Sequence, residues 1–164
     1  MRPKTYYNSS PEPVEIKLLG TGESLLVFRQ NIEEVQTEEG GVQYAADEYL
    51  LHVPYAENLL DRVETHLEEW LNKAVQEDYE REAAEVRAKR DALLAETDKE
   101  MCLDRLGLTS PEGSTFTAWI GFLKTIASAV FGSMAKYRQA LRDIPQQEGF
   151  PYDVTFPVPP EKGE

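Results

Sequence analysis

The residues of this chain that could carry out catalysis or hold a metal are few. Neither histidine, His52 or His66, belongs to an HxxxH or HExxH arrangement, which is the spacing typical of a zinc centre. The single cysteine, Cys102, excludes a disulfide and a thiolate zinc site within one chain. It lies beside Glu100 and Asp104, whose negative charges oppose formation of a reactive thiolate. These residues therefore predict neither a metal site nor a nucleophile.

Other sequence patterns give no better evidence for catalysis. The segment 20–22, Gly-Thr-Gly, lacks the third glycine of a nucleotide-binding loop and precedes another expected strand, so we interpret it as a turn. No serine lies in a nucleophile elbow. The 30 acidic residues produce carboxylate pairs by chance, so such pairs do not indicate a glycosidase. We predict that the protein is not an enzyme and needs no cofactor and no metal.

Composition limits the remaining classes of protein. The 164 residues fit one domain or a small domain with an extension, and 41% are apolar, with two Trp, eight Tyr and six Phe, which excludes a fully disordered chain. The formal net charge of −13 argues against a nucleic-acid partner, because a phosphate backbone attracts positive surface. The first residues lack the apolar core of a signal peptide, so we expect synthesis in the cytosol without export.

The elements that position side chains begin with a sheet. Val14, Ile16 and Leu18 alternate with charged residues, which is the period of a half-buried strand. An apolar run at 25–28 and one or two strands within 42–53 follow, separated by glycine-containing turns. The pattern predicts an antiparallel sheet of three or four strands. Such a sheet needs a cover on its apolar face.

One long helix is expected next, from about residue 56 to residue 97, because no proline or glycine interrupts this stretch. Apolar residues recur at steps of three and four from Leu60 to Ala74 and should cover the sheet. The apolar stripe thins after Val75, where a run of charged residues indicates a solvated connector. An acidic contact surface is the alternative interpretation of that run.

A second helix is expected from about residue 115 to residue 143, where Pro145 stops it. Its apolar residues step by four and three, a mean period of 3.5 that is typical of a helix packed along another helix. They are Phe116, Ile120, Leu123, Ala127, Val130, Met134, Tyr137 and Leu141. A second stripe contains small residues: Ala118, Gly121, Thr125, Ser128 and Gly132. The partner could be the 56–97 helix or another polypeptide, while Lys124 near the centre argues against a membrane span.

Two stretches near the C-terminus stand out. The first is residues 90–98, Arg-Asp-Ala-Leu-Leu-Ala-Glu-Thr-Asp, and the second is residues 137–151 with Val-Thr-Phe-Pro at 154–157. Together they resemble the C-terminal module of the phage tail assembly chaperone family. The resemblance covers roughly residues 85–160. Where such modules usually have a short linker, residues 99–135 insert a longer segment that contains the apolar helix.

The same residues suggest how this module would fold. Tyr137, Leu141 and Ile144 share one helical face, and a turn at Pro145 and Gly149 should fold the final arm back onto it. Packing would account for Leu141, Ile144 and Phe150, whereas partner contact is favoured for Arg138, Arg142, Gln146 and Gln147. The candidate partner-binding residues are Arg90, Asp91, Tyr137, Arg138, Arg142, Asp143, Pro145, Gln146, Gln147, Phe150, Pro151 and Phe156. The candidate helix-interface residues are Phe116, Ile120, Leu123, Ala127, Val130 and Met134.

Together these patterns predict an α+β protein with a small N-terminal antiparallel sheet, a long connecting helix and a C-terminal helical hairpin closed by an extended Pro/aromatic arm. The expected divisions are a sheet domain at 1–75, a connector at 76–98 and the chaperone-like module at 85–164. The resemblance implies a tail assembly chaperone that binds a phage tail protein, such as a fibre or the tape measure, in the bacterial host cytoplasm. The alternative is a structural or adaptor protein, retained in the virion tail, that forms a homo-oligomer through residues 115–143.

Overall fold

A computed structural model gives the fold, and it describes residues 2–20, 22–38, 40–98 and 115–160. The chain divides into two compact units, Met1–Glu82 and Ala83–Glu164. The first unit holds strands β1 (Thr5–Tyr7), β2 (Val14–Leu19), β3 (Glu23–Gln36) and β4 (Val42–Pro54) with helix α1 (Leu59–Thr65). Helix α2 (Leu67–Asp98) contributes to both units. The second unit also holds α3 (Phe116–Phe131), α4 (Ser133–Arg142) and the 3₁₀ helix η1 (Ile144–Gln146).

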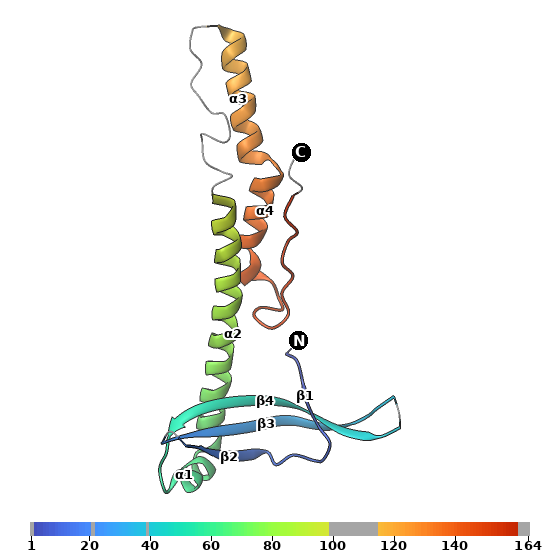
Figure 1. The fold of residues 1–164 in the computed structure, drawn as a ribbon, viewed down its shortest axis with the longest axis vertical. Helices are drawn as coiled ribbons and strands as arrows, with labels where there is room; N and C mark the ends of the chain where they lie inside the picture. Colours follow the sequence, from blue (N-terminus) through green and yellow to red (C-terminus); the bar gives the residue numbers. More distant parts are fainter. Residues whose placement is uncertain (1, 21, 39, 99–114, 161–164) are drawn as a thin grey trace. The chain divides into compact units, whose positions relative to one another are not determined.

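The sheet is antiparallel throughout, with strand order β1-β4-β3-β2. Figure 1 shows the long β3–β4 hairpin at its centre. The α+β class and the N-terminal sheet are therefore as predicted, and residues 42–54 form one strand rather than two. The three-residue strand β1 was not expected, because the residues around it show no alternating apolar pattern.

One face of the sheet is covered by helices, and the core of the first unit lies between them. The covering helices are α1 and the beginning of α2 (Figure 1), and side chains from β3 and β4 pack against them. The buried core residues are Leu26, Phe28, Leu51, Val53, Leu59, Val63 and Ala74. Trp70 and Leu71 pack against this cluster, so Val63, Trp70, Leu71 and Ala74 of the predicted stripe cover the sheet. Leu60 and Leu67 of that stripe are exposed instead, and Leu59 takes a core position.

The prediction of one uninterrupted helix from 56 to 97 is wrong, because the helix breaks at His66 (φ −125°, ψ 39°). Thr65 Oγ1 donates a hydrogen bond of 2.6 Å to the carbonyl oxygen of Asp61. A hydroxyl that bonds back to the preceding turn bends helices, and Thr and His both have modest helix propensity. α2 restarts directly afterwards, with the N–H of Trp70 donating to the His66 carbonyl oxygen at 3.2 Å.

The prediction of one helix from 115 to 143 is also wrong. Gly132 (φ −69°, ψ 176°) is extended and separates α3 from α4. Glycine is among the weakest helix formers, and its carbonyl oxygen accepts from the Lys136 N–H at 3.2 Å, which begins the next helix. The seam of period 3.5 is therefore not continuous from Phe116 to Leu141. The side chains of Thr125 and residues 128–131 lie outside the described residues, and so does Cys102.

Candidate protein-binding module

The second unit is built around three buried side chains, Tyr137, Leu141 and Ile144. They share one face of α4 and η1, as predicted, and residues from α2, from the start of α4 and from the final arm pack around them. These residues are Val86, Leu93, Leu94, Met134, Phe150, Val154 and Phe156. The last helical turn and the folded-back arm therefore form one core with α2, which is the closed hairpin that the sequence predicts.

A tight turn directs the arm back along the module. The N–H of Asp153 donates to the Gly149 carbonyl oxygen at 2.8 Å, and the N–H of Phe150 donates to the Gln147 carbonyl oxygen at 3.0 Å. A Cβ at Gly149 would collide with the backbone oxygen of Asp153 and lie 2.9 Å from its Cβ. The backbone approach at this turn thus requires glycine. The Phe150–Pro151 peptide bond is cis, and Pro151 is buried.

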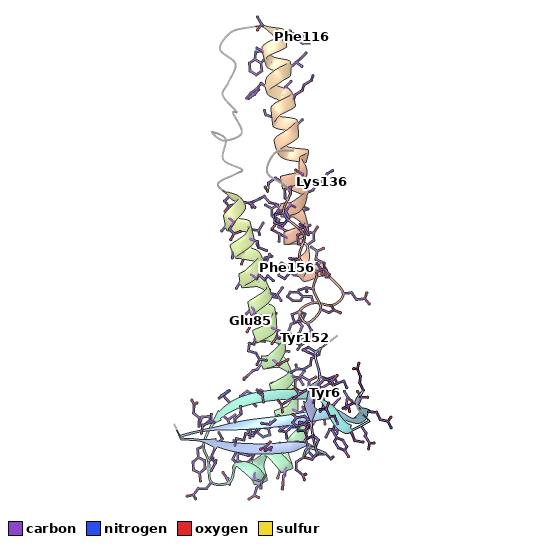
Figure 2. All side chains as sticks on the ribbon, turned by 45° about the vertical axis from the view of Figure 1, so that its right-hand side comes forward. Tyr6, Glu85, Phe116, Lys136, Tyr152 and Phe156 are labelled. Carbon is purple, nitrogen blue, oxygen red and sulfur yellow. The ribbon has the colours of Figure 1, made fainter. Side chains whose placement is uncertain are left out.

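Two cations of α2 lie against the aromatic rings of the arm. The guanidinium carbon of Arg87 is 5.4 Å from the centroid of the Phe150 ring, and Lys89 Nζ is 4.3 Å from that of Phe156. Both distances are within the range of cation–π attraction. Figure 2 shows Phe156 beside α2. The two phenylalanines proposed as partner contacts thus already pack within the chain.

Arg138 also has a role inside the module. Its guanidinium donates to the Leu94 carbonyl oxygen at 2.9 Å and to Thr97 Oγ1, and it forms an ion pair of 2.7 Å with Asp98 Oδ1. The last carbonyl groups of a helix lack partners within the helix. Arg138 therefore joins α4 to the C-terminal end of α2, and this contact alone accounts for an arginine at that position.

The other candidate residues of this module divide into internal and exposed groups. Gln147 binds the backbone of Thr155 in the arm, through bonds of 2.8 Å from each partner. Arg90 and its neighbour Asp91 form an ion pair of 2.7 Å on α2, and Asp143 accepts from Gln139 Nε2 at 2.9 Å. Pro145 is half-buried in η1, while the side chains of Arg142 and Gln146 are exposed. Asp91 is exposed as well, so Asp91, Arg142 and Gln146 are the members of this set whose side chains face solvent.

Helix α3 presents an apolar face to solvent in the single chain. Phe116 is 79% exposed and Leu123 58%, and Ile120 and Trp119 are also exposed. The Trp119 and Phe122 rings contact each other edge to face, with centroids 5.8 Å apart. Figure 2 shows Phe116 at the end of α3. Of the six candidate interface residues, Phe116, Ile120, Leu123 and Ala127 are exposed, Met134 is half-buried against the α4 core, and Val130 lies among the side chains that are not described.

The first unit contains a polar cluster that the sequence did not indicate. The Arg29 side chain is 5% exposed and binds Glu15 Oε2 at 2.6 Å, the Tyr7 hydroxyl at 2.8 Å and the Glu12 carbonyl oxygen at 3.0 Å. The hydrogen bond from Arg29 lowers the pKa of Glu15 below its usual value. Burial, followed by the hydrogen bond to Glu48, raises the pKa of Tyr7.

A second buried charge lies within the run that was predicted to be a solvated connector. Asp78 is 1% exposed and forms ion pairs with Arg2 and Arg81. The Arg2 guanidinium carbon also lies 4.2 Å from the centroid of the Tyr49 ring. Most neighbours of Asp78 in this run are exposed, as predicted. No periodic apolar signal marks a single buried carboxylate, so the sequence pattern did not reveal it.

Both histidines are exposed in the first unit. His66 lines an open hollow of about 390 Å³ at the break between α1 and α2, together with Arg62, Glu69, Trp70 and Lys73. Its nearest carboxylate, Glu69, is 3.9 Å away, and His52 is exposed on β4. In the described part of the chain, no three His, Cys, Asp or Glu side chains gather as metal ligands. None of the described helices is long and apolar enough to cross a bilayer.

The second unit is thus a short helical hairpin whose core is completed by an aromatic and proline-containing arm. Residues 83–161 match the family model described as "Phage tail assembly chaperone protein". The match confirms the resemblance that was predicted over roughly residues 85–160, and it supports a role in phage tail assembly. No curated protein and no solved structure matches the chain significantly.

Proposed function

We propose that this protein is a non-enzymatic tail assembly chaperone that binds a tail component, such as a fibre or the tape measure, in the host cytoplasm during morphogenesis. The family match over residues 83–161 carries this proposal. The compact hairpin and its arm supply a rigid support, which limits the entropy lost when a partner is bound.

The exposed face of α3 is the surface that we assign to the client. Phe116, Trp119 and Leu123 are large apolar side chains that lie together on one helical face and are exposed in the single chain. Exposed apolar patches of this kind mark interaction sites. Residues 115–142 contain no acidic residue and four basic ones, Lys124, Lys136, Arg138 and Arg142, in a chain of net charge −13. The face thus suits an apolar helical or fibre surface. Lys124 on α3 and Lys136 and Arg142 on α4 are exposed and would favour a client that also carries acidic side chains, whereas Arg138 is engaged within the module.

The chaperone would cover such a surface until assembly buries it. The remaining, strongly acidic part of the chain would keep the complexes apart, because like charges on bound copies repel each other. Arg142 and Gln146, which are exposed near the end of α4, are the candidate polar contacts at the edge of this interaction.

Co-expression of the tagged chain with each tail protein, followed by a pull-down, tests this function. We expect recovery of a tail component, and we expect Leu123→Glu to reduce that recovery about tenfold, since it buries a charge in an apolar contact. Thr117→Glu adds the same charge at an exposed position on another side of α3 and should retain binding. Retention of no tail protein, or equal retention by both variants, would contradict the proposal.

The second candidate is a structural tail or adaptor protein that oligomerises through residues 115–143. The exposed Phe116, Ile120 and Leu123, spaced as in a helix–helix seam, favour it. A stable homo-oligomer that Leu123→Glu dissociates, together with detection of the protein in mature particles, would support this candidate over the chaperone.

A further inference from the structure

Strand β4 has one edge that is only partly paired. It pairs with β3 along its length, but with β1 only at Tyr44, Ala45 and Ala46. Beyond β1, no strand among the described residues pairs with the outer edge of residues 48–53 (Figure 1). An unpaired edge presents backbone N–H and C=O groups that can accept another strand.

The hydrogen bonds around Arg29 show which backbone groups point to this edge. The Arg29 N–H donates to the Pro13 carbonyl oxygen at 2.8 Å, away from β4. Arg29 lies opposite Glu48, so the two form a non-hydrogen-bonded pair, and the backbone groups of Glu48 point away from β3. The Arg2 guanidinium, which donates to the Glu48 carbonyl oxygen, agrees with this direction. Because backbone directions repeat every second residue, Leu50 and His52 also direct their N–H and C=O groups to the open edge.

We propose that this edge pairs with the same edge of a second copy of the chain, in antiparallel register, to form a continuous sheet of four strands from each copy. The two copies are related by a twofold axis perpendicular to the sheet, so the helix-covered faces of both copies lie on the same side of the joined sheet. Each residue therefore lies opposite a residue whose side chain is on the same face. The Glu48 carbonyl oxygen is already bound by Arg2, so we choose the register in which it takes no part in the new ladder. In this register the twofold axis passes through the Leu51 pair. In this register Leu50 exchanges both backbone hydrogen bonds with His52 of the second copy, and His52 with Leu50.

The side chains are self-complementary in this register. Tyr49 lies opposite Val53 on the helix-covered face, and Leu51 lies opposite its own equivalent. Leu51 and Val53 are already buried within each chain, so pairing brings no polar or charged side chain together on that face. On the other face, Leu50 is opposite His52, which places no like charges together. Residues 49–53 also lack the lysine, proline and bulge that usually protect an open edge. An unrelated extended segment would have no such reason to match these positions.

Sedimentation velocity of the full chain over a range of concentrations tests this proposal. We expect a dimer that forms with rising concentration. The double variant Leu50→Lys with His52→Lys places lysines opposite each other twice, and should raise the dimer dissociation constant about tenfold or more. Leu50→Lys with His52→Glu places Lys opposite Glu at the same positions and should restore dimerisation. Leu18→Lys, at a 68% exposed residue of the other edge strand β2, is the control and should leave the dimer intact.

A chain that is monomeric at every concentration would overturn the proposal, and so would a dimer that is equally stable in both double variants. A dimer that is lost only on Leu123→Glu would place the association on α3 instead. If the lysine variants fail to fold, His52→Pro gives an independent test. Proline at 52 removes a donor at the open edge and leaves the β3 ladder intact, so it should abolish the dimer, and a persisting dimer would overturn the proposal.

Discussion

Gln147 and Thr155 are joined by two hydrogen bonds that tie the final arm to the end of η1. Gln147 Nε2 donates to the Thr155 carbonyl oxygen at 2.8 Å, and the Thr155 N–H donates to Gln147 Oε1, also at 2.8 Å. One side chain thus pairs with the backbone of an arm residue as a neighbouring strand would. The described residues of the arm belong to no sheet. Gln147 therefore satisfies the backbone N–H and carbonyl oxygen of Thr155, which a neighbouring strand would satisfy in a sheet.

Replacement of Gln147 by Ala should loosen the arm. Both bonds are exposed, so we expect a loss of only about 1 kcal/mol in the free energy of unfolding. Denaturant titration measures the loss, and limited proteolysis should show faster cleavage after residue 150. Gln146→Ala changes the exposed neighbouring side chain and should do neither. Equal stability of the two variants would show that the clamp does not hold the arm.

Gly149→Ala should destabilise the second unit much more strongly. The new Cβ would collide with the Asp153 backbone oxygen, which cannot move without opening the turn. We expect a loss of about 3 kcal/mol in the free energy of unfolding, measured by denaturant titration. Gly121→Ala is the matched control, because a Cβ there meets no atom within 4 Å and alanine favours the helix by about 1 kcal/mol. A tolerated Gly149→Ala would contradict the described turn.

The Arg29–Glu15 contact predicts how stability depends on pH. The pKa of Glu15 is lowered in the folded chain by the hydrogen bond from Arg29, so folding favours the ionised carboxylate. This contribution is complete above the ordinary Glu value of 4.5 and is lost as the pH falls through the lower folded value. The thermal midpoint should therefore drop between about pH 5 and about pH 3, and drop less in Glu15→Gln.

Glu34→Gln, at an exposed residue of β3, is the control for this comparison. It should retain the wild-type dependence on pH. If Glu15→Gln and the wild type lose the same stability over this interval, the ion pair with Arg29 does not contribute to acid sensitivity.

The periodic parts of the sequence predicted the fold well. Alternation at Val14 and Ile16 and the apolar run at 25–28 identified strands, and the shared face of Tyr137, Leu141 and Ile144 identified the core of the module. These residues were predictable because burial imposes a period of two or 3.6 on many positions at once. The same reasoning could not find β1, whose three residues are too short to show a period.

Local hydrogen bonds explain the failures. The helix break at His66 depends on one bond from Thr65, and no proline or glycine marks it. Gly132 was visible in the sequence, but the apolar spacing on both sides of it suggested a continuous helix. The bonds of Arg138 to the end of α2, which span 41–44 positions in the sequence, were also not foreseen, and its contact with a partner stays a prediction. Sequence spacing carries no signal for contacts that are so distant.

The break at Gly132 has a consequence for how this protein can change over time. Among the described residues, the core of the second unit draws on α4, the arm and α2, and takes no side chain from α3. Substitutions on the exposed side of α3 should therefore change the stability of the second unit little, whereas substitutions on the buried side of α4 are constrained by packing. Under the proposed function, substitutions at Phe116, Trp119 or Leu123 would change which client is bound while the fold of the hairpin stays the same.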